Sequence, residues 1–295
     1  MTAVNLMSLK NIQSPKRGGI PSPRHELAAA TPHVAHTGAP PNFIVVPQNI
    51  SLWGNDVHGD CVTAEEAFAK ACNNPEIFIT DNEVIAWATR HGVLEGAYLT
   101  SVMQWMQKDG FSNGSSTCNN GPFFSVDWTD SAVLTSAISK GPVKIGVAAD
   151  QLEAAWRNYG GKSGWFCVGF KQDNNEDHCI SLCGYGTLDW LAEQLQVQVP
   201  AGIDGTTAGY ALFTWNSIGI IDEQSLLAVI HEAWLRQPTT IRTTDTPGAL
   251  PSPKRGAFPT PKTERESAKP YIPTPTTLVP TTNAAKRGPP GGGNQ

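Results

Sequence analysis

Apolar positions in the first half of the chain recur at the spacing of amphipathic helices. Within Cys61–Cys72, the apolar residues Ala64 and Phe68 fall on one helix face. Thr80 and Glu83 have the spacing of a capping box, a pattern that begins a helix because each side chain bonds a backbone N–H near the other. The same patterns predict further helices over residues 80–91, 98–108 and 131–139.

The periodicity changes in the second half, where residues 143–148 alternate like a strand and 179–184 and 210–215 form short apolar runs. Residues 222–236 are predicted to form a final helix, because Leu226, Ile230 and Trp234 recur at helical spacing. Helices followed by strands predict an α+β fold with two lobes, first helical and then antiparallel β, with a cleft between them.

The two ends of the chain differ in composition from its centre. All nine tryptophans and all six cysteines lie between Trp53 and Trp234, whereas only five of the 23 prolines fall between residues 42 and 237. Segments that lack large apolar groups cannot bury enough surface to offset chain entropy. The composition therefore predicts disordered Pro-rich tails over 1–41 and 238–295, and one folded domain over 42–237.

Charge divides along the same boundaries. The central region has nine Lys and Arg against 22 Asp and Glu, while each tail has more basic than acidic residues. An acidic domain argues against nucleic-acid binding by the folded part.

Compartment and cofactors follow from what the sequence lacks. No apolar run approaches the length of a membrane span, and the first residues contain no apolar segment of signal-peptide length, so we expect an intracellular protein without a membrane partner. No cofactor is expected. Cys179, Cys183 and His178 have poor spacing for zinc, and no second pair of ligands lies near them in sequence.

Three residues could carry out nucleophilic chemistry. Cys61 stands at a predicted helix N-terminus, where unpaired N–H groups favour a thiolate, although a buried structural cysteine would look the same. His178 opens an apolar strand and could act as a base, with His58 as a rival because it lies close to Cys61 in sequence. Asn216 ends a strand, where it could orient an imidazole or simply terminate the strand.

The sequence around these residues resembles papain-like cysteine peptidases in chain order. The matching segments are Asn55–Cys61 (NDVHGDC), Ala137–Asp150 (AISKGPVKIGVAAD), Asp177–Gly186 (DHCISLCGYG) and Trp215–Gly219 (WNSIG). The resemblance implies a papain-like two-lobe fold and hydrolysis of peptide bonds in peptide or protein substrates. It also implies that Cys61 is the nucleophile, His178 the base and acid, Asn216 the residue that holds His178, and Asn55 an oxyanion donor with the backbone N–H of Cys61.

The chain departs from the family pattern in ways that leave an alternative open. Asn55 stands where the family has Gln, and Ile218 stands where it has a shielding Trp. Asp60 precedes Cys61, and an adjacent carboxylate opposes thiolate formation unless it points away. The alternative is a catalytically inactive papain-fold protein that binds or assembles through its Pro-rich tails.

A sequence repeat brackets the central domain. Residues 14–26 (SPKRGGIPSPRHE) and 252–264 (SPKRGAFPTPKTE) are identical at eight of thirteen positions. The basic tails and the acidic domain suggest an intramolecular contact in which a tail enters the cleft, as a pro-segment or substrate mimic would. The rival hypothesis is that the tails tether the domain to a scaffold or package it in a particle.

Overall fold

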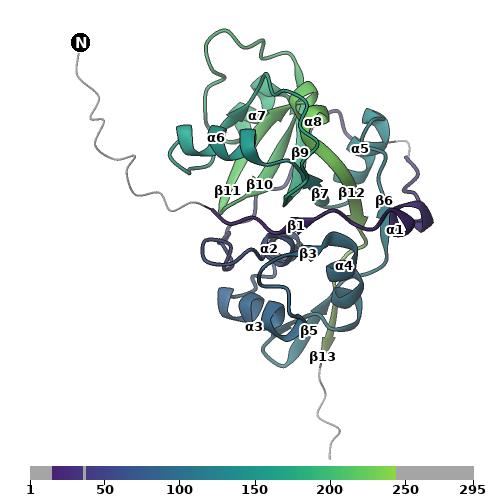
Figure 1. Ribbon diagram of the computed structural model, residues 1–295. Coiled ribbons are helices and arrows are strands. Elements are labelled where there is room, and N and C mark those ends of the chain that lie inside the picture. The colour runs from purple at the N-terminus through teal and green to yellow at the C-terminus, as the bar shows by residue number, and fades with distance from the viewer. Residues whose placement is uncertain (1–14, 36–37, 244–295) are drawn as a thin grey trace, which may run out of the picture. The chain divides into compact units, whose positions relative to one another are not determined.

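The computed structural model describes residues 15–35 and 38–243, which form two lobes (Figure 1). The helical lobe contains α2 (Cys61–Ala71), α3 (Asp81–His91) and α4 (Leu99–Lys108). A three-stranded sheet closes this lobe, with strands in the order β13 (Thr240–Thr243), β5 (Ser116–Asn119) and β4 (Phe111–Asn113).

The second lobe is built on a larger sheet. Its strand order is β6 (Phe123–Ser125), β12 (Ile230–Arg236), β7 (Val143–Val147), β9 (His178–Thr187), β10 (Ala208–Thr214), β11 (Ser217–Asp222) and β8 (Phe166–Cys167), and β2 (Phe43–Ile44) also pairs with β9. Its helices are α5 (Ser131–Ile138), α6 (Asp150–Asn158), α7 (Leu188–Gln194) and α8 (Glu223–Val229). The predicted α+β fold is confirmed.

Local signals explain where the predicted helices begin and end. The Thr80 hydroxyl accepts the backbone N–H of Glu83 at 3.3 Å at the start of α3, as the capping-box pattern predicts. The same helix ends at Gly92, whose φ of 69° is left-handed and suits a residue without a Cβ.

One predicted element is wrong: residues 222–236 are not a single helix. Helix α8 ends at Val229, and residues 230–236 form β12 between β7 and β6. The apolar spacing of residues 230–236 fits either a helix or a strand. Pairing with β7 and β6, which are distant in sequence, determines that they form a strand. In the strand, the buried Arg236 forms a pair of hydrogen bonds with Glu65 at 2.6 and 2.7 Å.

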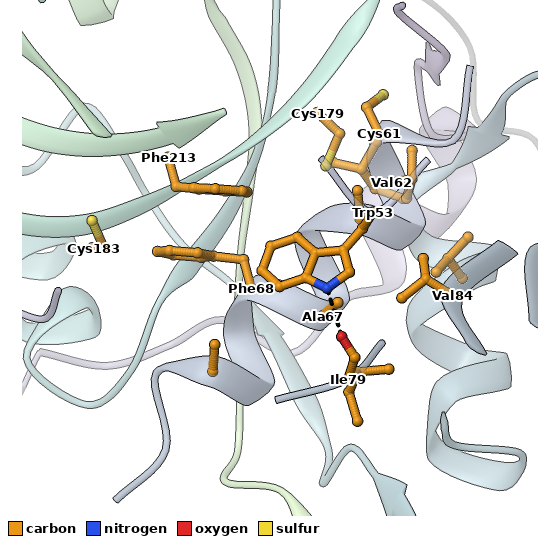
Figure 2. Packing of buried hydrophobic residues seen from close by; sticks show 14 of the residues in the cluster. Trp53, Cys61, Val62, Ala67, Phe68, Ile79, Val84, Cys179, Cys183 and Phe213 are labelled. Atoms are coloured by element: carbon orange, nitrogen blue, oxygen red, sulfur yellow. Dashed lines mark hydrogen bonds between the residues drawn. The ribbon is translucent and has the colours of Figure 1, made fainter. Parts of the chain in front are cut away.

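Aromatic side chains join the two lobes (Figure 2). Phe68 of α2 stacks on Phe213 of β10, with ring centroids 4.0 Å apart and planes within 3°. Trp53 packs edge-on against Phe213 and donates its indole N–H to the carbonyl of Ile79 at 2.7 Å. Stacked and edge-on aromatic pairs add to simple burial, so this cluster fixes α2 against the sheet.

Residues 15–35 were assigned to the N-terminal tail, but the structure describes them in contact with the domain. They contain β1 (Gly19–Ile20) and α1 (Arg24–Ala29), and β1 runs between the lobes beside β3 (Ala97–Tyr98), as Figure 1 shows. Thr31 and His33 continue the contact by bonding the backbone of Ser125. The tail assignments for 1–14 and 244–295 lie outside the described residues.

Candidate functional site

Cys61 is the first residue of α2, a helix whose residues are almost all buried. As a first helical residue it has an N–H without an acceptor inside the helix, and the helix dipole favours negative charge beside it. Cys61 is only 2% exposed. Burial raises its pKa to about 12, although hydrogen bonds from the backbone of Cys179 and Gly18 act in the opposite direction.

His178 opens β9 and is fully buried. Its Nε2 lies 2.7 Å from the hydroxyl of Thr214, and its ring stacks on Trp215 with centroids 4.6 Å apart. Within the described residues, no hydrogen-bond partner reaches Nδ1. Burial and the nearby charge of Arg17 lower the pKa of His178 to about 3, so the imidazole is neutral in this state.

Asn216 is not brought to His178, because one ring nitrogen bonds Thr214 and the other has no partner. Trp215 and Asn216 are the two turn residues between β10 and β11, with φ of 47° and 56°. Two-residue hairpin turns need positive φ, which Asn tolerates well. The turn places Trp215 over the His178 ring and leaves Asn216 exposed.

Asn55 lies beside Cys61. Together with Cys61, Thr214 and Trp215 it lines a residual space of about 10 Å³, too small to hold an ordered water comfortably. Its amide Nδ2 donates to the carbonyl of His58 at 3.1 Å. In this state the amide is therefore engaged within its own loop.

Asp60, which directly precedes Cys61, is 1% exposed. Burial raises the pKa of its carboxyl to about 8, while a hydrogen bond from Asn55 favours the charged form. At neutral pH most of this carboxyl is protonated. The electrostatic objection that the sequence raises against a Cys61 thiolate is correspondingly weak.

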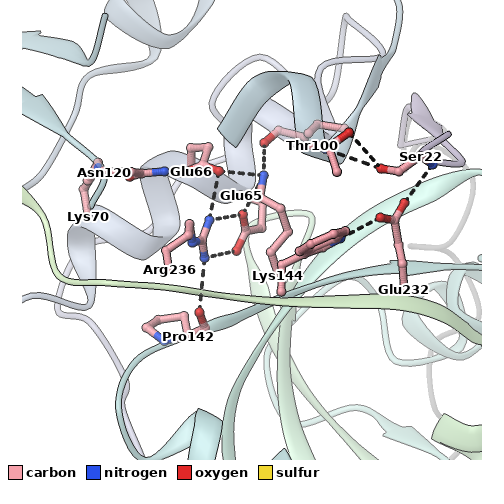
Figure 3. Close-up of polar contacts among 12 residues, drawn as sticks. Ser22, Glu65, Glu66, Lys70, Thr100, Asn120, Pro142, Lys144, Glu232 and Arg236 are labelled. Atoms are coloured by element: carbon pink, nitrogen blue, oxygen red, sulfur yellow. Dashed lines mark hydrogen bonds and ion pairs between the residues drawn. The ribbon is translucent and has the colours of Figure 1, made fainter. Parts of the chain in front are cut away.

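A buried ion cluster holds α2 against the large sheet (Figure 3). Lys144 of β7 donates to the carbonyl of Val62 at 2.8 Å and pairs with Glu65 and Glu66 at 2.9 Å each. Arg236 of β12 pairs with the same two carboxylates. No sequence pattern predicts this arrangement, because the lysine and the two consecutive glutamates lie far apart in the chain and only the fold brings them together.

The N-terminal segment, residues 15–23, passes directly over the candidate site. The N–H of Lys16 donates to the carbonyl of Asn55 at 3.0 Å, and Trp215 Nε1 donates to the carbonyl of Lys16 at 3.2 Å. Gly19 donates to the carbonyl of Asp177 at 3.1 Å. Ala97 donates to the carbonyl of Gly18 at 2.9 Å, so the segment bonds both lobes.

Two consecutive glycines of the N-terminal segment touch the two candidate catalytic residues. The backbone of Gly18 reaches the Cys61 thiol, and a Cβ on Gly18 would overlap the carbonyl oxygen of Gly59. A Cβ on Gly19 would lie 2.6 Å from the carbonyl carbon of His178. Cys61 and His178 thus lie against one short stretch of chain, and side chains larger than hydrogen do not fit there without displacement.

Arg17 supplies the charged contact of the N-terminal segment. Its guanidinium lies 2.6 Å from Asp150, 2.6 Å from Asp177 and 2.5 Å from Glu153. The first and last of these carboxylates belong to the opening turn of α6, and Asp177 directly precedes His178. Further along, Ser22 donates its N–H to buried Glu232 at 3.1 Å, visible in Figure 3.

The arrangement of the lobes was compared with known proteins. A procathepsin L 3 from the larval midgut of Tenebrio molitor superposes with a TM-score of 0.51 at 12% identity, over 78% of this chain and 77% of that one. The chain has a papain-like fold. The proform of the ragweed pollen cysteine protease Amb a 11 gives a TM-score of 0.50 at 11% identity, over 73% of this chain and 74% of that one.

Sequence comparisons add nothing to this likeness: no family model matches the chain, and no curated protein matches it. The papain-like fold inferred from the sequence motifs is therefore confirmed by structure alone. Across residues 15–35 and 38–243, no helix is long and apolar enough to cross a membrane.

Proposed function

We propose that the chain is a cysteine peptidase, with Cys61 as nucleophile and His178 as base and then acid. The observation that carries the proposal is that one stretch of chain, Gly18-Gly19, lies against both residues at the cleft of a papain-like fold. The papain-like neighbours that share this fold are proteases by name.

The hydrogen bond between His178 and Thr214 assigns the ring nitrogens their roles. If Nε2–H donates to the Thr214 hydroxyl, Nδ1 carries the lone pair and is free to take the Cys61 proton. The thiolate then attacks the peptide carbonyl, and the acyl-enzyme forms as His178 returns the proton to the leaving amine. We assign to Thr214 the orienting role that the resemblance gave to Asn216.

The oxyanion would be held by the N–H of Cys61 and the amide of Asn55. Each donor of this kind contributes about 3 kcal/mol to transition-state stabilisation. Asn55 must first release the carbonyl of His58 and the carboxyl of Asp60, both of which belong to residues 55–60. Trp215 covers one face of His178 and excludes water from the bond with Thr214.

We further propose that residues 15–23 hold the peptidase in an inactive state. The N-terminal segment fills the site, and its burial of Cys61 and His178 favours the neutral forms of both residues. A neutral thiol is a poor nucleophile. Displacement of this segment lets water reach Cys61 and His178, and this water stabilises the charged thiolate and imidazolium.

Labelling of the full chain with a papain-directed epoxide tests the proposal, with the modified residue located by mass spectrometry. We expect slow labelling of the native chain and rapid labelling of Gly18→Ala at Cys61 alone. Adding His178→Ala to Gly18→Ala should abolish the label. Gly141→Ala is the matched control, because a Cβ there meets open space.

Hydrolysis of an unfolded protein substrate by Gly18→Ala, lost in Gly18→Ala/Cys61→Ala, completes the test. A correctly folded Gly18→Ala chain that neither reacts at Cys61 nor cleaves substrate would refute the peptidase proposal. That outcome would favour a papain-fold binding protein instead.

A further inference from the structure

The contacts of the N-terminal segment define which peptides the cleft accepts. Three features of the segment matter: the guanidinium of Arg17 among three carboxylates, the absence of side chains at Gly18 and Gly19, and the N–H and hydroxyl of Ser22. By contrast, Lys16 and Ile20 are exposed, so the cleft accepts many different side chains at those two positions of a bound peptide.

The chain carries the same pattern a second time, at residues 252–261. Arg255 and Gly256 correspond to Arg17 and Gly18. Thr260 corresponds to Ser22 and keeps both its N–H and its hydroxyl. The replacement of Ile20 by Phe258 falls at an exposed position of the first copy.

We infer that the cleft is a binding site for this second copy, which takes the place of residues 15–23 when they leave. The ligand class is a basic peptide with the pattern Lys-Arg-Gly-small-apolar-Pro-Ser/Thr-Pro. The exchange loses no charge pairing, because Arg255 offers to Asp150, Glu153 and Asp177 the same guanidinium as Arg17.

One difference between the copies sets their order of affinity. Ala257 stands where the first copy has Gly19, and a Cβ there lies 2.6 Å from the carbonyl carbon of His178. The second copy must therefore shift to fit, and overpacking of this kind weakens a contact about tenfold. The first copy thus holds the cleft at rest, and the second binds more weakly and reversibly once the first is displaced, so Cys61 of Gly18→Ala still reacts faster than in the native chain.

A third Lys-Arg-Gly, at 286–288, serves as an internal control. It is followed by Pro289, which has no N–H to donate to the carbonyl of Asp177 as Gly19 does. We expect this copy to be rejected. The three copies in one chain thereby predict an order of binding: 14–26 first, then 252–264, with 281–293 not bound.

The inference rests on the proposed function only for the location of the cleft, so binding is measured without turnover. The protein is the full chain with Cys61→Ala, Gly18→Ala and Arg255→Glu, which removes the nucleophile and both internal competitors. The probes are three fluorescein-labelled peptides with the sequences of residues 14–26, 252–264 and 281–293, followed by anisotropy. Circular dichroism checks the fold, and Arg17→Glu replaces Gly18→Ala should that variant misfold.

We expect saturable binding in the order given above. Within the peptide of residues 252–264, Ala257→Gly should tighten binding about tenfold. In the same peptide, Arg255→Ala should weaken binding about tenfold or more. With residues 15–23 left native in the protein, every peptide should bind at least tenfold more weakly.

Equal binding of all three peptides, or binding insensitive to Arg255 and Ala257, would overturn the inference and indicate general attraction of basic peptides to an acidic domain. Absence of binding by the 252–264 peptide would overturn it as well. Restoring Arg255 in the protein shows which chain supplies residues 252–264 to the cleft. If these residues compete with the labelled peptide equally at every protein concentration, they come from the same chain. If the competition grows with protein concentration, they come from a second copy. Binding without Cys61 labelling would uphold this inference while refuting the peptidase.

Discussion

The buried ion cluster under α2 makes a prediction about charge balance. Two carboxylates, Glu65 and Glu66, face three cations, Lys144, Arg236 and Lys70. Burial lowers the pKa of Lys70 to about 8 even though Glu66 raises it, so this lysine is still mostly charged at pH 7. Glu66→Gln would leave one carboxylate among three buried cations, whereas Lys144→Met would leave two carboxylates facing two cations.

The two substitutions should therefore lower the free energy of unfolding by different amounts, although each removes one charge. An uncompensated buried charge costs about 3–5 kcal/mol, which is the expectation for Glu66→Gln. Lys144→Met brings the cluster to two carboxylates and two cations, and it loses the bond to Val62 and the ion pairs of Lys144, so about 1–3 kcal/mol is expected.

Urea unfolding of the full chain at pH 7, followed by tryptophan fluorescence, measures both free energies. The midpoint of thermal unfolding should fall by at least about 6 °C for Glu66→Gln. Gly141→Ala, where a Cβ meets open space, controls for an unrelated substitution in the same protein. Equal destabilisation by the two variants would refute the reasoning, as would a loss below about 1 kcal/mol for Glu66→Gln.

Three further predictions concern the site and its support. In the Gly18→Ala background, Thr214→Val should lower the rate of substrate cleavage at least about tenfold, whereas Asn216→Ala should leave it within about twofold; the reverse order would restore Asn216 to the orienting role. The pKa of His178 is about 3 folded and near 6.5 unfolded, so the unfolded state binds more protons between these values and stability falls as pH drops. Between pH 6.5 and 5, the free energy of unfolding measured in urea should therefore fall by about 2 kcal/mol more for the native chain than for His178→Gln. Parallel plots of this free energy against pH for the two proteins would contradict the prediction. Phe68→Ala should cost about 3–5 kcal/mol in the same assay because it removes the stack on Phe213, and a loss under about 1 kcal/mol would show that the cluster in Figure 2 relaxes around the gap.

The sequence predicted the elements whose signals are local. The helix at Cys61, the capping box at Thr80 and the strand at His178 are all present. Within the predicted helix over 222–236, residues 230–236 were mispredicted because their apolar spacing suits a helix and a buried strand equally. Pairing with β7 and β6 decides in favour of the strand, and no local pattern encodes that pairing.

Asn216 shows why a residue type in the right order is insufficient evidence for a role. A hairpin turn with two positive-φ residues explains an asparagine at this position without any reference to His178. The partner of His178 is instead the last residue of the preceding strand, Thr214. A search for turn chemistry in the sequence would have flagged Asn216 as a turn residue, but only the fold identifies Thr214.

Pro-rich composition indicates that residues 15–23 cannot build a core of their own, yet it says nothing about whether they bind another surface. The N-terminal segment binds through backbone hydrogen bonds to Asn55, Asp177 and Ala97 and through one guanidinium, and none of these contacts requires an apolar side chain. In the proposed peptidase, the same contacts would exclude substrate and water together. Because exclusion of water is also what keeps Cys61 and His178 neutral, access and chemical activation cannot be separated in this site. One substitution that displaces the segment should therefore restore both at once.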